Sequence, residues 1–80
     1  MYDKQLMLKI IGERFKHYRK LKGFSREDAA KMLGVTSRTL AAYERGEREI
    51  STRTTLKMAQ IYGTTFRQLT NYRFEEELSL

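Results

Sequence analysis

The chain has 80 residues, of which 40% are hydrophobic and 32% are charged, so it is sized for one domain with a small core and is too apolar for a disordered tail. It contains no cysteine, which excludes disulfides, thiolate zinc sites and thiol nucleophiles, and no apolar run approaches the roughly 20 residues that span a bilayer. Its formal net charge of +6 favours a polyanionic partner.

The first expected element is a helix that ends near Lys22. Its apolar residues recur at steps of three and four: Leu8, Ile11, Phe15 and Tyr18. Its basic residues are expected on the rest of the surface: Arg14, Lys16 and Lys20. Gly12 lies inside this helix at a cost of about 1 kcal/mol relative to alanine, which indicates either the close approach of another backbone or an exposed site that tolerates glycine.

The residues before this stripe do not form a signal peptide. Asp3, Lys4 and Lys9 interrupt the apolar residues of the segment, which therefore lacks a continuous hydrophobic region. We expect a cytoplasmic protein without a membrane segment.

A second helix is expected from Arg26 to Leu33. Ser25 and Asp28 have the spacing of a capping box at its start, and Gly34 follows its last residue. Three of its apolar residues are expected to face inward: Ala29, Ala30 and Leu33.

A third helix, at about residues 37–45, follows a tight turn at Gly34 and Val35. Thr36 is a suitable N-cap, Leu40 and Tyr43 are expected on the inner side, and Gly46 ends the helix. Two helices joined by so short a turn, between Ser25 and Arg45, have the sequence form of a helix-turn-helix.

Two more helices are expected towards the C-terminus. Ser51 caps the fourth, which ends at Gly63 and has an inner face of Leu56 and Ala59, with Met58 or Tyr62 as further candidates. A capping box of Thr65 and Gln68 opens a short fifth helix whose Phe66 and Leu69 turn inward. The sequence thus predicts an all-α bundle of five helices over residues 1–72, followed by an acidic tail at residues 73–80.

The segment from Ile11 to about Leu69 resembles the phage repressor and Cro family of helix-turn-helix domains, also called the xenobiotic-response-element type. The resemblance is carried by IGERFKHYRKLKGFSREDAAKMLGVTSRTLAAYERGERE, then by a helix with Leu56, Met58 and Ala59, then by GTTFRQL. It implies a repressor-like bundle that presents its third helix to the major groove of double-stranded DNA, usually as a homodimer on an inverted repeat. Transcriptional repression is the commonest role in this family.

The sequence departs from the family pattern in three ways. Proline is usual near Ile50, and leucines are usual where Thr52 and Thr55 stand, so the loop should be looser and the fourth helix less apolar. Glutamine is usual where Arg26 stands, but arginine also donates hydrogen bonds, so a phosphate contact there should survive.

The resemblance also implies roles for individual residues. Base contacts fall to residues on the groove side of the third helix: Ser37, Arg38 and Ala42. Arg38 is the strongest of these candidates, since a guanidinium can bond guanine O6 and N7 together. Phosphate contacts fall to residues around both helix N-termini and the following loop: Ser25, Arg26, Thr36, Arg45 and Arg48. For Arg45 and Arg48, ion pairing with nearby glutamates is the alternative.

Two further assignments are structural. Arg19 and Glu44 match a family ion pair that joins the first helix to the end of the third. Tyr72, Phe74 and Leu78 lie beyond the family's usual core and are expected in a dimer interface, the alternatives being a segment that folds back or a solvated tail.

Catalysis and cofactor binding are not expected. His17 has no second histidine or nucleophile motif near it, so a solvated histidine is the simpler interpretation, and no metal cluster or phosphate loop is present in the sequence. Controllers of restriction-modification systems and antitoxins share this pattern with repressors. The alternative from another class is a module of the same fold that binds a protein partner, which the chemically sparse third helix favours slightly.

Overall fold

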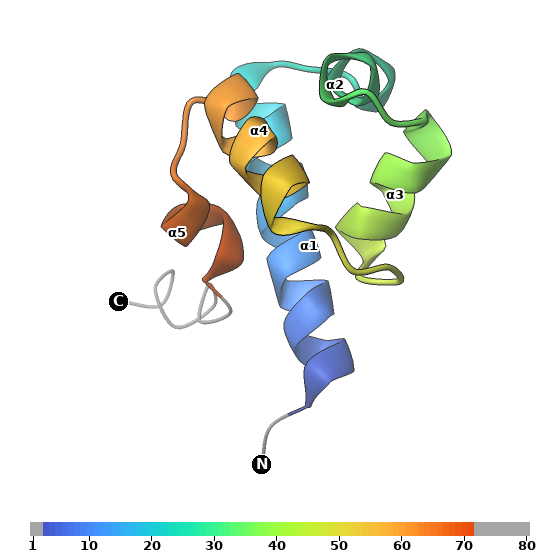
Figure 1. Ribbon diagram of the computed structural model, residues 1–80, viewed down its shortest axis with the longest axis vertical. Coiled ribbons are helices and arrows are strands. Elements are labelled where there is room, and N and C mark those ends of the chain that lie inside the picture. The colour runs from blue at the N-terminus through green and yellow to red at the C-terminus, as the bar shows by residue number, and fades with distance from the viewer. Residues whose placement is uncertain (1–2, 72–80) are drawn as a thin grey trace.

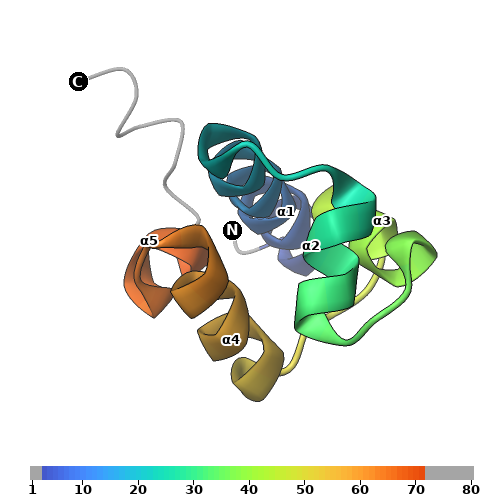
Figure 2. The ribbon, with the colours of Figure 1, turned by 90° about the horizontal axis from the view of Figure 1, so that it is seen from above.

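The computed structural model describes residues 3–71, and within this range the chain forms only helices. They are α1 (Lys4–Lys22), α2 (Arg26–Leu33), α3 (Ser37–Arg45), α4 (Thr52–Tyr62) and α5 (Phe66–Thr70). The long α1 runs through the molecule, with α2 and α3 on one side, α5 on the other and α4 across the front (Figures 1 and 2). The prediction of an all-α, five-helix bundle is confirmed.

Local capping sets the boundaries of these helices. Each begins after a side chain that accepts a hydrogen bond from a backbone N–H of the first turn: Asp3, Ser25, Thr36, Ser51 and Thr65. The first four end at a left-handed glycine: Gly23, Gly34, Gly46 and Gly63. The predicted starts and ends of α2, α3 and α4 are therefore correct.

The core is formed by buried side chains from all five helices: Phe15, Ala29, Ala30, Leu33, Leu40, Tyr43, Met58, Ala59, Tyr62 and Leu69. The inward residues expected in α2 and α3 are confirmed. In α1 only Phe15 of the predicted stripe is fully buried, whereas Leu8, Ile11 and Tyr18 are half-buried.

Two residues expected in the core lie at the surface instead. Leu56 is 51% exposed and Phe66 is 37% exposed. The buried stripe of α4 is Thr55, Met58, Ala59 and Tyr62, a spacing of i, i+3, i+4 and i+7 that leaves Leu56 on another side of the helix. Thr55 fills its core position because its hydroxyl donates to the Ser51 carbonyl at 2.9 Å, which satisfies its polar atom.

Arg14 was expected at the surface but is 1% exposed. Its Nε donates to the backbone carbonyl of Gln68, and its Nη2 lies 3.2 Å from Gln68 Oε1, which also accepts from the Tyr18 hydroxyl at 2.9 Å. Arg14 and Tyr18 are four residues apart and so share a face of α1. Of the five residues of α5, only Leu69 is buried. This face of α1 therefore holds α5 by hydrogen bonds as well as by apolar contact.

Gly12 lies where two backbones meet. A Cβ at this position would be 2.5 Å from the Glu44 carbonyl oxygen and 2.6 Å from that of Tyr43. The close approach indicated by the sequence is confirmed, and the alternative of an exposed site is wrong. The end of α3 therefore rests directly on the backbone of α1.

The Tyr62 hydroxyl is buried, and it makes no hydrogen bond within the described part of the chain. Burial, followed by the nearby Glu44 carboxylate, raises the pKa of this hydroxyl above its ordinary range, so it stays neutral. Tyr62→Phe removes this unsatisfied hydroxyl and breaks no hydrogen bond of the described residues. The substitution should therefore leave the free energy of unfolding unchanged or raise it by about 1 kcal/mol. Urea unfolding tests this expectation, and a loss of more than about 1 kcal/mol would reveal a hydrogen bond to the hydroxyl.

Candidate nucleic-acid interface

The segment from Ser25 to Arg45 folds as two short helices joined by a tight turn (Figures 1 and 2). Gly34 has φ of +76°, and the N–H of Val35 bonds the Ala30 carbonyl at 3.0 Å, which closes the end of α2. Ala30 is only 2% exposed, and its small side chain lets the two helices pack closely. The geometry is that of a helix-turn-helix.

The second helix of this unit, α3, has one buried and one accessible side. The buried side is Leu40, Ala41, Tyr43 and Glu44. Arg38 is exposed, and Ser37 and Ala42 are half-buried. Arg38 and Ala42 are four residues apart, so they lie on the same side of α3. Ser37, the first residue of α3, is three and four residues before the buried Leu40 and Ala41, so the structure brings Arg38 and Ala42 together on the accessible side and leaves Ser37 at its edge.

The residues predicted to contact phosphate differ in their surroundings. Ser25 and Thr36 are exposed N-caps, and their hydroxyl oxygens accept from the amides of Asp28 at 3.1 Å and Thr39 at 3.0 Å. Arg45 and Arg48 are exposed, and the Arg45 guanidinium lies 3.9 Å from a Glu47 carboxylate oxygen. An exposed pair at that distance contributes little stability, so Arg45 is able to exchange Glu47 for another anion.

A buried cluster of charges fixes α3 to α1 and α2. Arg19 Nε lies 2.7 Å from Glu44 Oε2, and Arg19 Nη2 lies 3.2 Å from Glu44 Oε1. Both residues are buried, and Arg19 also donates to the Phe24 carbonyl at 2.9 Å. This two-point geometry fixes the relative orientation of the two helices.

Arg26 joins this cluster as a third member that the sequence did not indicate. Its Nε lies 3.3 Å from Glu44 Oε1, while 37% of its side chain remains exposed. Any phosphate contact by Arg26 therefore has to coexist with, or replace, part of its bond to Glu44.

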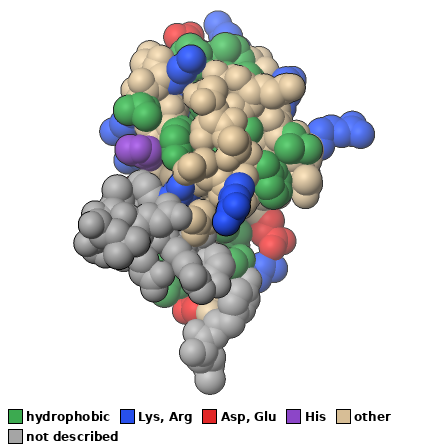
Figure 3. Space-filling model, turned by 90° about the vertical axis from the view of Figure 1, so that its left-hand side faces the viewer, with side chains coloured by type: hydrophobic (Ala, Val, Ile, Leu, Met, Phe, Trp, Pro, Cys, Tyr) green, Lys and Arg blue, Asp and Glu red, His purple; other side chains and the backbone are tan. Residues whose placement is uncertain are grey.

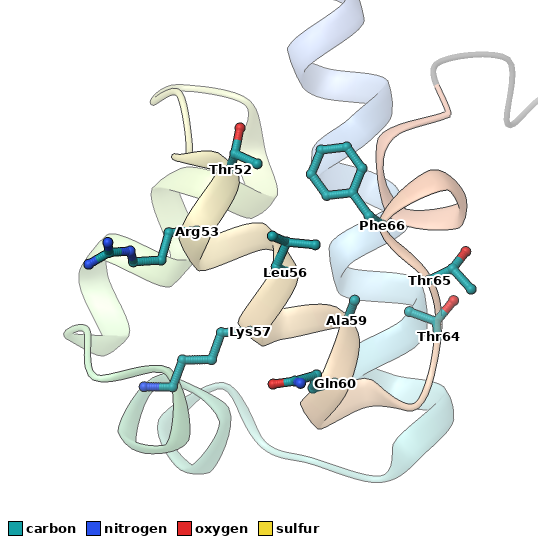
Figure 4. Close-up of a pocket in the computed structure, with 9 residues that line it drawn as sticks. All are labelled: Thr52, Arg53, Leu56, Lys57, Ala59, Gln60, Thr64, Thr65 and Phe66. Carbon is teal, nitrogen blue, oxygen red and sulfur yellow. The ribbon is translucent and has the colours of Figure 1, made fainter.

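Two cations of α4 also escaped the sequence-based assignment. Arg53 and Lys57 are exposed, and they extend from α4 on the side away from Phe66 (Figure 4). Lys57 Nζ reaches to 3.5 Å from the Leu33 carbonyl at the end of α2. Their spacing of four residues, which places both on one side of a helix, was the available signal.

The remaining candidates for other functions are weak. His17 is exposed, and its ring meets that of Tyr18 edge to face at 5.1 Å. Among residues 3–71, no three His, Cys, Asp or Glu side chains are grouped closely enough to hold a metal ion. Over the same range, no helix has both the length and the apolar composition of a membrane span.

Comparison with known proteins adds to this geometry. Residues 15–69 match the family model described as helix-turn-helix. Over 63 residues the chain is 33% identical to an uncharacterized HTH-type transcriptional regulator of Methanocaldococcus jannaschii, a match that covers 79% of this chain and 96% of that protein.

Solved structures are also similar. The restriction-modification controller protein C.AhdI from Aeromonas hydrophila has a TM-score of 0.73 and 32% identity, over 78% of this chain and 94% of that one. Hydroxypropylphosphonic acid epoxidase from S. wedmorenis has a TM-score of 0.77 and 28% identity, over 84% of this chain but only 36% of the epoxidase chain. The same fold thus also forms part of a larger enzyme.

Proposed function

The chain belongs to the helix-turn-helix family, and from that membership we infer that it is a DNA-binding transcriptional regulator that reads the major groove with α3. The observation that carries this inference is the accessible side of α3, which has two exposed arginines, Arg38 and Arg45, and the small Ala42 between them, on a helix fixed from behind by Arg19 and Glu44. A fixed helix with an open polar side is what base recognition requires. Regulators of this kind are generally not enzymes, and no catalytic step is part of the proposal.

Sequence reading falls mainly to Arg38. Its guanidinium would bond guanine O6 and N7 together, while Ser37 would bond a base edge or a phosphate and Ala42 would contact a thymine methyl group. With so few polar groups on α3, part of the specificity would come from the shape of the DNA.

Phosphate contacts would position the domain. They fall to residues at the N-termini of α2 and α3, at the end of α3 and in the loop that follows: Ser25, Arg26, Thr36, Arg45 and Arg48. Arg26 would contribute through the exposed part of a side chain that stays bonded to Glu44.

Replacement of Arg38 by alanine and replacement of Arg45 by alanine are expected to weaken DNA binding in different ways. Arg38→Ala should lower affinity for a duplex selected from a random pool by a factor corresponding to about 1 to 3 kcal/mol, with little change for random DNA. Arg45→Ala should weaken binding to both and reduce the slope of log affinity against log salt by about one unit.

Titrations of both duplexes at several salt concentrations separate these outcomes. Lys20→Ala, an exposed cation outside the interface, is the matched control. If Arg38→Ala weakens both duplexes equally, Arg38 is a phosphate contact and the base assignment is wrong.

We further propose a homodimer that binds an inverted repeat, because one sparse recognition helix reads too few bases to be selective in a genome. The residues assigned to its interface on sequence grounds are Tyr72, Phe74 and Leu78, and they lie outside the described residues. Repression is the proposed sense of regulation. The protein would act inside the cell, where the DNA lies. A protein-binding module of the same fold is the second candidate, favoured by the exposed Leu56 and Phe66.

A further inference from the structure

The first turns of α1, residues 4–9, lie against the loop that joins α3 to α4, residues 46–51. A Cβ on Gly46 would be 2.6 Å from the backbone nitrogen of Lys9 and 2.7 Å from the carbonyl carbon of Leu8. These neighbours are backbone atoms, so no flexible side chain can move aside to make room. The loop therefore begins in direct contact with α1, at a position where only glycine fits.

Three contacts follow one side of α1. Lys4 Nζ lies 2.8 Å from Glu49 Oε1, Leu8 meets Gly46, and Gly12 meets the carbonyl groups at the end of α3. The three positions of α1 are four residues apart, so they lie one above the other on the same side of the helix. This side of α1 therefore supports the chain from the end of α3 as far as Glu49.

The loop carries an acid on each side of Arg48. A Glu47 carboxylate oxygen lies 3.9 Å from the Arg45 guanidinium, and Glu49 is paired with Lys4. Within the described part of the chain, neither acid forms an ion pair with Arg48. Side chains of opposite charge lie next to one another at the lower end of the face shown in Figure 3, the end at which α1 begins. Lys4 thus engages an acid that could otherwise pair with the neighbouring Arg48.

We propose that residues 4–9 of α1 position the loop for DNA binding: the backbone contact with Gly46 fixes where the loop starts, and Lys4 holds Glu49 so that Arg48 is available to a phosphate. This inference rests on the proposed DNA-binding function and makes one of its phosphate contacts depend on Lys4. An exposed ion pair contributes little to folding, so the effect of Lys4 is expected on DNA binding rather than on stability. These turns precede the segment that matches the family model, so the match assigns them no role.

A double-mutant cycle in the full-length chain tests the role of Lys4. Lys4→Gln and Arg48→Ala are made alone and together, and a random duplex is titrated at several salt concentrations. In the natural sequence, Arg48→Ala should reduce the slope of log affinity against log salt by about one unit. In the Lys4→Gln background the same substitution should reduce the slope by less than about half a unit, because Glu49 then pairs with Arg48 in place of DNA.

Lys9→Gln is the matched control for this cycle. It removes the same charge from an exposed side chain on the same turns of α1 and leaves the backbone that meets Gly46 unchanged. Arg48→Ala should again reduce the slope by about one unit in this background. An equal reduction in the Lys4→Gln and Lys9→Gln backgrounds would overturn the role of Lys4, which would then act through its charge alone. An Arg48→Ala protein with the natural slope would also overturn it, since Arg48 would contact no phosphate.

Gly46→Ala tests the backbone contact separately, with Gly23→Ala as its matched control. Both glycines have positive φ, +71° and +85°, so alanine is strained at either position. A Cβ on Gly23 would meet no atom within 4 Å, whereas a Cβ on Gly46 would meet the backbone of α1. Gly46→Ala should therefore reduce the salt slope by up to about two units, one each for Arg45 and Arg48, and Gly23→Ala should leave the slope unchanged.

Circular dichroism establishes that the variants compared are helical, and the cycle with Lys4 needs no change in the backbone. A helical Gly46→Ala protein that binds DNA with the natural slope would overturn the role of the backbone contact. Natural protein that binds DNA while the cycle shows no coupling would contradict this inference alone. Natural protein that binds no DNA at any salt concentration would contradict the proposed function itself, so the two failures are distinguishable.

Discussion

Replacing Glu44 with alanine is expected to lower the free energy of unfolding by about 3 to 5 kcal/mol, a large share of the stability of so small a domain. The loss would leave the buried guanidinium of Arg19 without its carboxylate, and Arg26 would lose the same partner. Arg19→Ala should cost less within this range, because Arg26 Nε remains 3.3 Å from the abandoned Glu44 carboxylate.

Thermal and urea unfolding of the two variants measure this effect. The control is Glu47→Ala, which removes one partner of the exposed Arg45 pair and should change stability by less than about 0.5 kcal/mol. Unchanged midpoints for both Glu44→Ala and Arg19→Ala would mean that the charge cluster does not hold α3 in place. An order in which Arg19→Ala costs more would point to its bond with the Phe24 carbonyl as the larger contribution.

Gly12→Ala is the second substitution with a large expected effect, and its sign is diagnostic. In an exposed helix, alanine in place of glycine stabilises by about 1 kcal/mol. Here the added Cβ would lie 2.5 Å from the Glu44 carbonyl oxygen, and that oxygen belongs to the backbone of α3 rather than to a flexible side chain. We expect a net loss of roughly 1 to 3 kcal/mol as the helices are forced apart.

Urea unfolding of Gly12→Ala is compared with that of Glu13→Ala, a substitution at the adjacent exposed position of α1. Displacement of α3 should also weaken binding of DNA, which the Glu13→Ala control should leave unchanged. A Gly12→Ala protein that is more stable than the natural sequence would contradict the close contact between the two backbones.

The features that local chemistry decides were predictable from the sequence. Ser25, Thr36 and Ser51 cap helices at the predicted positions, because capping depends on residues only two or three apart. Gly12 was also informative, since a glycine inside a helix needs a reason beyond propensity.

The features that depend on distant segments were not predictable. Arg14 is buried because α5, more than 50 residues later, supplies the oxygens of Gln68. Leu56 is exposed because the helices that pack on α4 cover its Thr55, Met58, Ala59 and Tyr62 side, which the apolar residues of α4 alone do not specify. The place of Arg26 beside Glu44 likewise depends on how α2 and α3 pack, which periodicity alone does not specify.

Selection of bound duplexes from a random pool by the natural full-length chain tests the central claim most directly. If α3 reads the major groove in a symmetric dimer, the selected sequences should contain an inverted repeat whose half-sites are centred about 10 to 10.5 base pairs, or a multiple of that, apart. The same selection with Arg38→Ala should lose preference at a guanine within each half-site. A pool that binds but shows no enriched sequence would contradict sequence-specific recognition and transfer support to the protein-binding module.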